Sequence, residues 1–166
     1  SNYLEKYGVK TEATASLRTG ISRFTFPKGK SHILLNLGEG LTNETGATMR
    51  FVNDHEIEGS KLLGSFCYVN NQAVYPIYFV MRLSKKPIQK GYWKFQRSGD
   101  AWENEWNKDA GKYKLFTSYQ NELSGDDIGA FLSFETIENE QIEVQLGVSF
   151  VSIANARENL EQEQPS

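Results

Sequence analysis

The chain has 166 residues, with 18 Lys and Arg against 21 Asp and Glu, so its formal net charge is −3. This length predicts one domain that can bury a core without disulfides, and the single cysteine, Cys67, allows no intrachain disulfide. With 13% aromatic residues, short apolar runs and a mild negative charge, the sequence argues against a disordered chain, a membrane-spanning helix and a nucleic-acid-binding domain.

The hydrophobic pattern predicts β-strands. In Val9–Leu17 and Gln141–Phe150 apolar and polar residues alternate, which places one face of a strand on a core and the other in water. Further runs rich in β-branched and aromatic residues also predict strands. In chain order, these are Ser22–Phe26, His32–Leu37, Ala47–Val52, Lys61–Val69, Val74–Leu83, Lys112–Tyr119 and Ile128–Ile137.

Turn-forming segments separate these runs, among them Pro27–Gly29, Glu58–Ser60 and Ser124–Asp126. Pro76 lacks an N–H, so we expect it at an edge, a strand start or a bulge. Many short strands at this spacing predict an all-β fold, an antiparallel sandwich or barrel.

The alternation stops at Ser152. Residues 152–164 are good helix formers, Ser152 is a suitable N-cap, and Pro165 would end the helix. We therefore divide the chain into a β domain over residues 1–151 and a helical linker over residues 152–166. A terminal helix packed on the sandwich is the alternative. Because the chain begins without a leader and ends in a polar acidic stretch, we expect a piece of a longer protein.

The sequence contains no recognisable catalytic or metal centre. His32, His55 and Cys67 do not have zinc-ligand spacing, and no Gly-x-Ser-x-Gly motif is present. Glycosidases use paired carboxylates, but the pairs here lie in segments typical of solvated turns, so we predict no catalytic and no metal-binding residue. These pairs are Asp54 and Glu56, Glu103 and Glu105, Asp126 and Asp127, and Glu138 and Glu140.

The segment Gly91–Gly111 has the most unusual composition. It contains Trp93, Trp102 and Trp106 among glycines and polar residues, and it does not alternate as a strand would. Aromatic rings on a loop can stack on sugars while neighbouring acids bind the hydroxyls, so these tryptophans and Asp100 are candidate sugar-binding residues. Alternatively, the rings close the end of the sandwich or pack against a neighbouring domain.

Several segments together have a distinctive order. They are Thr25–Gly29, His32–Gly38, Glu56–Gly59, Val74–Phe79, and Gly147–Ser152 leading into Asn155–Leu160. This series resembles the N-terminal β-domain of glycoside hydrolase family 92, the bacterial exo-acting α-mannosidases. The last two segments are similar to the family's junction between β-domain and helical domain. The resemblance covers nearly the whole chain and is weakest across Gly91–Gly111, and Ala154 stands where the family leads us to expect an acid.

The resemblance implies an antiparallel β-sandwich of the supersandwich type that packs on an (α/α)₆ helical domain of the same parent chain. Family members are calcium-dependent and invert configuration while releasing terminal α-linked mannose from glycans. Their general acid, general base and calcium ligands lie mainly in the helical domain, so the resemblance implies no catalytic residue and no cofactor for this chain. It further implies a periplasmic or cell-surface location.

We therefore expect a non-catalytic supporting domain, inactive alone, whose parent is an enzyme with Ca²⁺ bound in the helical domain. Two alternatives stay open at this point. The chain could be an independent carbohydrate-binding β-sandwich module, or a structural or adhesion domain of a surface protein.

Overall fold

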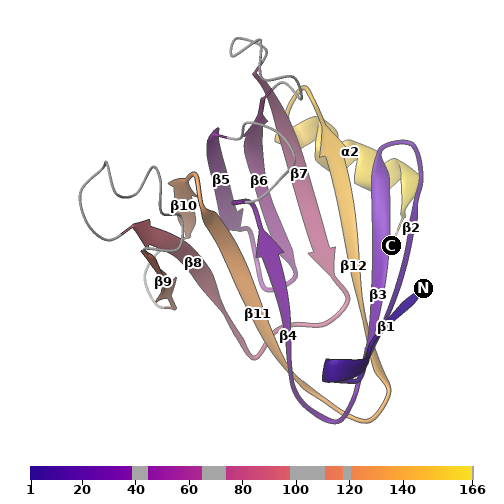
Figure 1. The fold of residues 1–166 in the computed structure, drawn as a ribbon. Coiled ribbons are helices and arrows are strands. Elements are labelled where there is room, and N and C mark those ends of the chain that lie inside the picture. Colours follow the sequence, from indigo (N-terminus) through magenta and orange to yellow (C-terminus); the bar gives the residue numbers. More distant parts are fainter. Residues whose placement is uncertain (39–44, 65–73, 98–110, 118–120, 166) are drawn as a thin grey trace.

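The computed structural model describes residues 1–38, 45–64, 74–97, 111–117 and 121–165. In these ranges the chain forms β-strands, a short 3₁₀ turn, η1 (Glu5–Tyr7), and a C-terminal helix, α2 (Ile153–Glu163) (Figure 1). The strands are β1 (Asn2–Leu4), β2 (Val9–Ala15), β3 (Thr19–Phe26), β4 (Gly29–Asn36), β5 (Thr45–Phe51), β6 (Glu56–Leu63), β7 (Tyr75–Leu83), β8 (Gln89–Arg97), β9 (Gly111–Phe116), β10 (Glu122–Gly125), β11 (Ile128–Thr136) and β12 (Glu140–Ser149).

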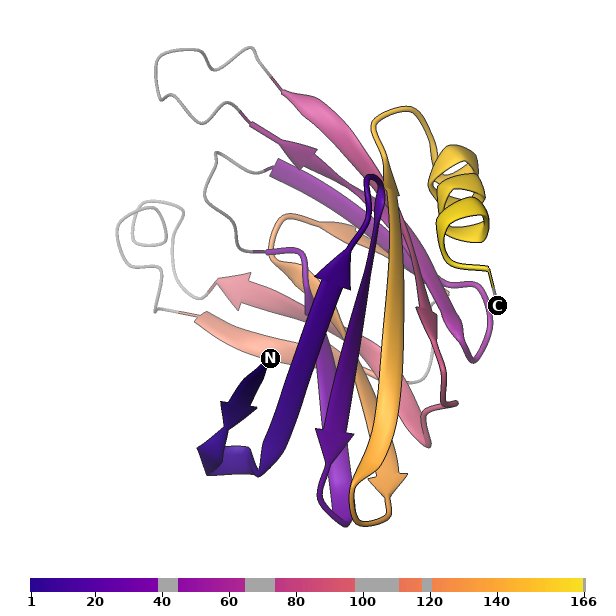
Figure 2. The same ribbon diagram turned by 90° about the vertical axis from the view of Figure 1, so that its right-hand side faces the viewer.

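The strands form two sheets that face each other, and every pair of neighbours is antiparallel. The larger sheet has the order β1-β2-β3-β12-β7-β6-β5-β10, and the smaller has the order β4-β11-β8-β9. Figure 2 shows α2 on the outer face of the larger sheet, away from the smaller one. The predicted all-β antiparallel sandwich is confirmed.

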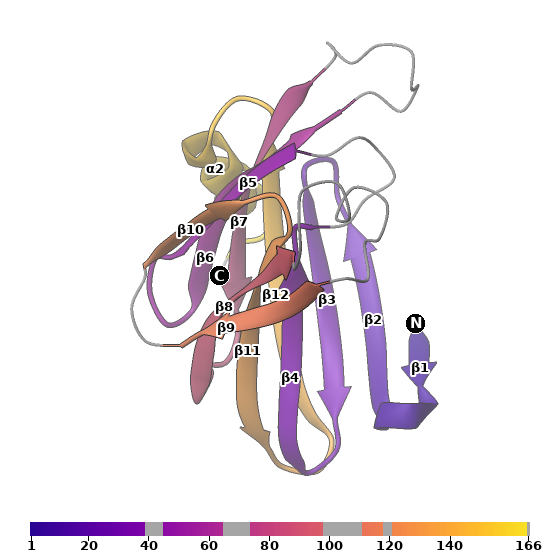
Figure 3. The same cartoon turned by 60° about the vertical axis from the view of Figure 1, so that its left-hand side comes forward.

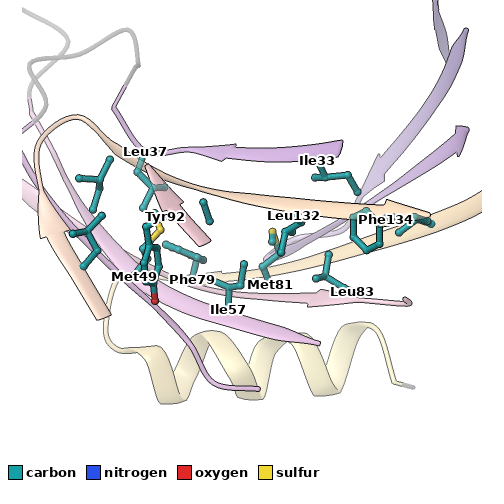
Figure 4. Packing of buried hydrophobic residues seen from close by; sticks show 14 of the residues in the cluster. Ile33, Leu37, Met49, Ile57, Phe79, Met81, Leu83, Tyr92, Leu132 and Phe134 are labelled. Atoms are coloured by element: carbon teal, nitrogen blue, oxygen red, sulfur yellow. The ribbon is translucent and has the colours of Figure 1, made fainter. Parts of the chain in front are cut away.

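The core lies between the two sheets and follows from the alternation of side chains along each strand. On β11, for example, Leu132 and Phe134 point inward with no exposed surface, and Figure 4 shows them opposite Met81 and Leu83 of the larger sheet. Tyr92 also lies in this core, and its hydroxyl donates to the Asn121 carbonyl. Burial of each such large apolar side chain stabilises the fold by about 1.5–3 kcal/mol.

Several strand ends meet at one end of the sandwich, which we call the junction end. Here Leu63 at the end of β6 pairs with Tyr75 at the start of β7, and Ser149 at the end of β12 pairs with Tyr78. At the same end of the smaller sheet, Asn36 pairs with Gly129. From β12 the chain passes directly into α2, so the helix begins at the junction end (Figure 1).

Several local predictions are confirmed. The strand predicted over Gln141–Phe150 is β12, Pro76 is the second residue of β7, and α2 begins after Ser152. The Ser152 hydroxyl accepts a hydrogen bond from the Asn155 N–H at 3.1 Å, as an N-cap does. Among the described residues, no helix is long and apolar enough to cross a membrane.

Other predictions are wrong. The predicted turn Glu58–Ser60 lies inside β6, because Gly59 is needed for close packing: a Cβ there would lie 2.9 Å from the Phe79 ring. The strand predicted over Lys61–Val69 is therefore shifted, and its residues 65–69 lie outside the described residues. The predicted loop over Gly91–Gly111 begins too early, since Gly91–Arg97 belong to strand β8.

Candidate domain interface

Of the predicted sugar-binding residues, Trp93 is the one within the described part of the chain. It lies in a strand and not in the predicted loop, on the outer face of the smaller sheet that Figure 3 brings forward. Its side chain is 9% exposed, and its ring covers the paired Gly129, where any Cβ would collide with it. The ring therefore has a packing role in this sheet. Trp102, Trp106 and Asp100 lie outside the described residues.

Both histidines are hydrogen-bonded, each to a different part of the sandwich. The Nδ1 atom of His32 lies 2.9 Å from the Ser133 hydroxyl, and the Nδ1 atom of His55 lies 3.0 Å from the Leu83 carbonyl oxygen. Among the described residues, no three His, Cys, Asp or Glu side chains gather as metal ligands.

Asp54 and Glu56, predicted as a pair of turn acids, differ in their exposure. Asp54 lies on the surface, where ion pairs with Lys86 and Lys90 lower its pKa to about 2. The prediction that Glu56 lies in a solvated turn is wrong. This residue lies in β6 and is 7% exposed, and Glu58, two positions along the same strand, is 4% exposed. Because strand side chains alternate, both carboxylates point to the outer face of the larger sheet, where α2 lies.

Helix α2 packs on this face through a small apolar contact. Ala156 and Leu160 are fully buried and form a cluster with Val80 of β7. Gly147 of β12 makes room for the helix, since a Cβ there would lie 2.8 Å from the Cβ of Leu160. In addition, the Asn159 side chain donates to the Val148 carbonyl at 2.8 Å.

A row of alternating charges surrounds that contact, and we call it the charge chain. It runs through Arg50, Glu58, Arg157, Glu56, Arg82 and Glu161. Each oxygen of both buried carboxylates has its own arginine: Arg50 and Arg157 bind Glu58, and Arg82 and Arg157 bind Glu56. Arg157 and Glu161 belong to α2, so the charge chain joins the helix to β5, β6 and β7.

These contacts set the ionisation of Glu56. Burial raises the pKa of this carboxyl, but hydrogen bonds from Arg82 and Arg157 outweigh it, so the pKa lies below its ordinary 4.5. A carboxyl with a lowered pKa stays ionised at neutral pH and cannot serve as the general acid of a glycosidase. The geometry therefore indicates a structural role for Glu56 and Glu58.

The far end of α2 is attached separately, to the turn between β2 and β3. The Glu163 carboxylate accepts hydrogen bonds from the Ser16 hydroxyl and from the Arg18 side chain, the latter at 2.7 Å. The Ser16 hydroxyl and then the Arg18 group lower the pKa of Glu163 to about 2. The Gln164 amide also donates to the Thr19 hydroxyl at 2.8 Å. The helix is thus fixed along its whole length.

Next to the start of α2, apolar side chains are left exposed. We call Val74, Tyr75, Phe150 and Val151 the junction patch. The rings of Tyr75 and Phe150 meet edge to face with their centroids 5.8 Å apart, yet Phe150 remains 66% exposed and Val151 73% exposed. An exposed apolar patch of this kind is a candidate interaction surface.

The sequence of the sandwich corresponds to a known family. A model described as the glycosyl hydrolase family 92 N-terminal domain matches residues 1–149. The chain belongs to this family. The recognition made from the sequence is thereby confirmed. No curated protein matches the chain.

Solved structures show the same family 92 fold. The family GH92 α-mannosidase BT3965 from Bacteroides thetaiotaomicron, solved alone and with mannoimidazole, has a TM-score of 0.75 and 26% identity over 98% of this chain. The inverting mannosidase BT2199 from the same organism has a TM-score of 0.68 at 18% identity over 96% of this chain, and at that identity it shows the fold alone. The chain covers 20% of BT3965 and 18% of BT2199.

Proposed function

We propose that this family 92 N-terminal domain is the non-catalytic supporting domain of a calcium-dependent, inverting exo-α-mannosidase that releases terminal mannose from glycans. Its membership of the family supports this proposal, as does its similarity to the α-mannosidase BT3965, of which it covers 20%. In this proposal the catalytic carboxyls and the Ca²⁺ belong to a helical domain of the same parent chain, and the enzyme acts in the periplasm or at the cell surface.

The observation that carries the proposal is the junction between β12 and α2. The helix begins beside an exposed apolar patch and is fixed to the sheet at several points, so whatever follows it in a parent chain starts from a defined place. We propose that the helical domain covers the junction patch. Active-site clefts commonly form between domains, and the supporting domain would form one wall of that cleft.

The charges of the described residues agree with a supporting role. An inverting glycosidase needs two carboxyls roughly 6.5–9.5 Å apart, one of them protonated, on opposite sides of the sugar. Glu56 and Glu58 are buried carboxylates whose oxygens are all bound by arginines. Both carboxylates are therefore already engaged in ion pairs within this chain.

The first test is an activity assay of the purified 166-residue chain. With an aryl α-mannoside and calcium, we expect no release of the aryl group by this chain, and calcium-dependent, chelator-sensitive turnover by the full product of the parent gene. Turnover by the 166-residue chain alone would contradict the proposal. A parent gene product without mannosidase activity would do the same.

The same chain can be titrated with mannose to test the sugar-binding alternative. Trp93, Trp102, Trp106 and Asp100 are the candidates for that role, and Trp102→Ala and Trp106→Ala are the matched variants. We expect no saturable binding at millimolar mannose. Saturable binding that both variants lose would favour an independent carbohydrate-binding module over a supporting domain.

The patch is tested in the full parent protein. Replacing Tyr75 and Phe150 by Ser should lower kcat/KM and the thermal midpoint, because the contact between the domains weakens. The control is Ile137→Ser, which changes a 70% exposed residue in the turn after β11, at the opposite end of the sandwich. Equal effects of the two changes would contradict the placement of the interface at the junction end.

A further inference from the structure

The attachment of α2 has a feature that apolar packing does not explain. An 11-residue helix is not stable in water by itself, so α2 depends on its contact with the sheet. The apolar part of that contact is small, with Ala156, Leu160 and Val80 buried and Tyr78 and Ile153 beside them. This cluster is separate from the core between the sheets.

We propose that Arg157 is a latch that holds α2 on the larger sheet and fixes its orientation, and that α2 opens as a unit when this latch is removed while the sandwich stays folded. The proposal concerns contacts within this chain. Its test therefore does not depend on the proposed mannosidase function.

The geometry of Arg157 supports this role. One of its terminal nitrogens binds Glu56 and the other binds Glu58. These acids occupy successive outward positions of β6, so a single planar guanidinium bridges them. This double contact limits both rotation of α2 about its axis and its sliding along the strand. A lysine offers one point charge and cannot reproduce the fork.

The partners of the two acids explain why the helix alone should open. If Arg157 is removed, Glu58 keeps Arg50 and Glu56 keeps Arg82, and these two arginines belong to β5 and β7. The sheet therefore retains compensated charges on its outer face. The helix loses the one residue that contacts both buried carboxylates.

The test is amide hydrogen exchange of the 166-residue chain with and without Arg157→Met, which keeps an unbranched apolar stem and removes the charged guanidinium. We expect amides of α2 after its first turn to exchange at least about tenfold faster, because they exchange through local opening. Amides of β11, such as those of Leu132 and Phe134, should keep their protection. The exchange rates of the α2 amides in Arg157→Lys should lie between those of the unchanged chain and those of Arg157→Met.

The matched control is Arg23→Met. Arg23 forms an ion pair with Glu143 on the same outer face and is 45% exposed, and this pair does not involve α2. We expect no change in α2 protection in this variant. Loss of α2 protection equal to that of Arg157→Met would overturn the proposal, since any lost arginine would then have the same effect.

A double-mutant cycle separates charge from packing. When Glu56 and Glu58 are both replaced by Gln, removal of Arg157 should change α2 protection by less than about twofold, because its charged partners are gone. A full effect of Arg157→Met in that background would overturn the latch, as would unchanged α2 protection in the single variant. Equal loss of protection in α2 and β11 would show that the helix does not open separately.

Discussion

Different interactions stabilise the core between the two sheets and the contact between α2 and the larger sheet. Between the sheets the facing strands bury large apolar side chains such as Ile57, Leu132 and Phe134. Under α2 a small apolar cluster is surrounded by the charge chain. Apolar burial is strong but not directional, whereas paired guanidinium and carboxylate groups fix relative orientation. The core therefore supplies most of the apolar burial, whereas directional ion pairs dominate the contact under the helix.

The largest expected effect is a cavity in the core. Phe134→Ala removes a fully buried ring, so we expect a loss of about 3–5 kcal/mol in the free energy of unfolding, measured by urea titration. The control is Phe150→Ala, which removes the same ring where it is 66% exposed and should cost less than about 1 kcal/mol. Similar losses for the two variants would contradict the assignment of the core.

A smaller effect is expected where the helix approaches the sheet most closely. Gly147→Val places methyl groups against Leu160 and the Ala156 carbonyl, so α2 must move, at a cost of about 1–3 kcal/mol. Exchange of the α2 amides should report this displacement. Gly20→Val is the matched control, because a Cβ at Gly20 meets only the Thr14 carbonyl, at 3.7 Å. Unchanged α2 protection in Gly147→Val would refute the close contact.

Acid should release the helix before it affects the core. The pKa of Glu56 is lowered and that of Glu163 falls to about 2, each from an ordinary 4.5. A carboxyl whose pKa is lower in the folded than in the unfolded state stabilises the fold at pH values above its unfolded pKa. This contribution disappears as the pH falls through the pKa of the folded state. We therefore expect α2 protection to be constant above about pH 5 and to decrease towards pH 2.

Two variants distinguish this acid effect from general denaturation. Glu163→Gln should remove the part that comes from Ser16 and Arg18. Glu12→Gln is the control, since the pKa of Glu12 is lowered by Lys10 on β2, away from the contacts of α2. The measurement is amide exchange corrected for the intrinsic rate at each pH. Release of α2 above pH 5, or together with β11, would argue against the charge chain as its support.

The smallest effect is expected at the exposed ion pair of Arg23 and Glu143. Its partners are 45% and 35% exposed, so Arg23→Met should change the free energy of unfolding by about 0–1 kcal/mol. The urea midpoint should differ even less in high salt, because surface charges are screened there. A loss comparable to that of Phe134→Ala would contradict the contrast between core and surface charges.

Part of the fold could be predicted from the sequence because its signals are local. The alternation of Gln141–Phe150 predicted β12 to within one residue, and Ser152 predicted the start of α2. By contrast, Gly59 and Gly91 suggested loops, although each is a strand residue. Glycine is needed at these positions because of contacts with residues that are distant in the sequence. Gly59 lies against the ring of Phe79, and Gly91 lies against that of Phe131, both on other strands. The sequence has no local signal for such contacts.

The charge chain could not be predicted for the same reason. Arg157 is about a hundred positions from Glu56 and Glu58, and nothing in the sequence pairs them. The available hint is the pattern Glu56-Ile57-Glu58, in which a buried apolar residue separates two acids. In a strand this pattern places both acids on one face. Whether water or a helix covers that face depends on where a distant segment, here α2, packs.

The attachment of Glu163 and Gln164 to the turn between β2 and β3 has a mechanical consequence. A pulling force applied to the chain after Pro165 acts first on the contacts with Ser16, Arg18 and Thr19. From there the load passes into β3, which pairs along its length with β12 near the middle of the larger sheet. Motion of a following segment would thus be transmitted to the centre of the sandwich and not only to its edge.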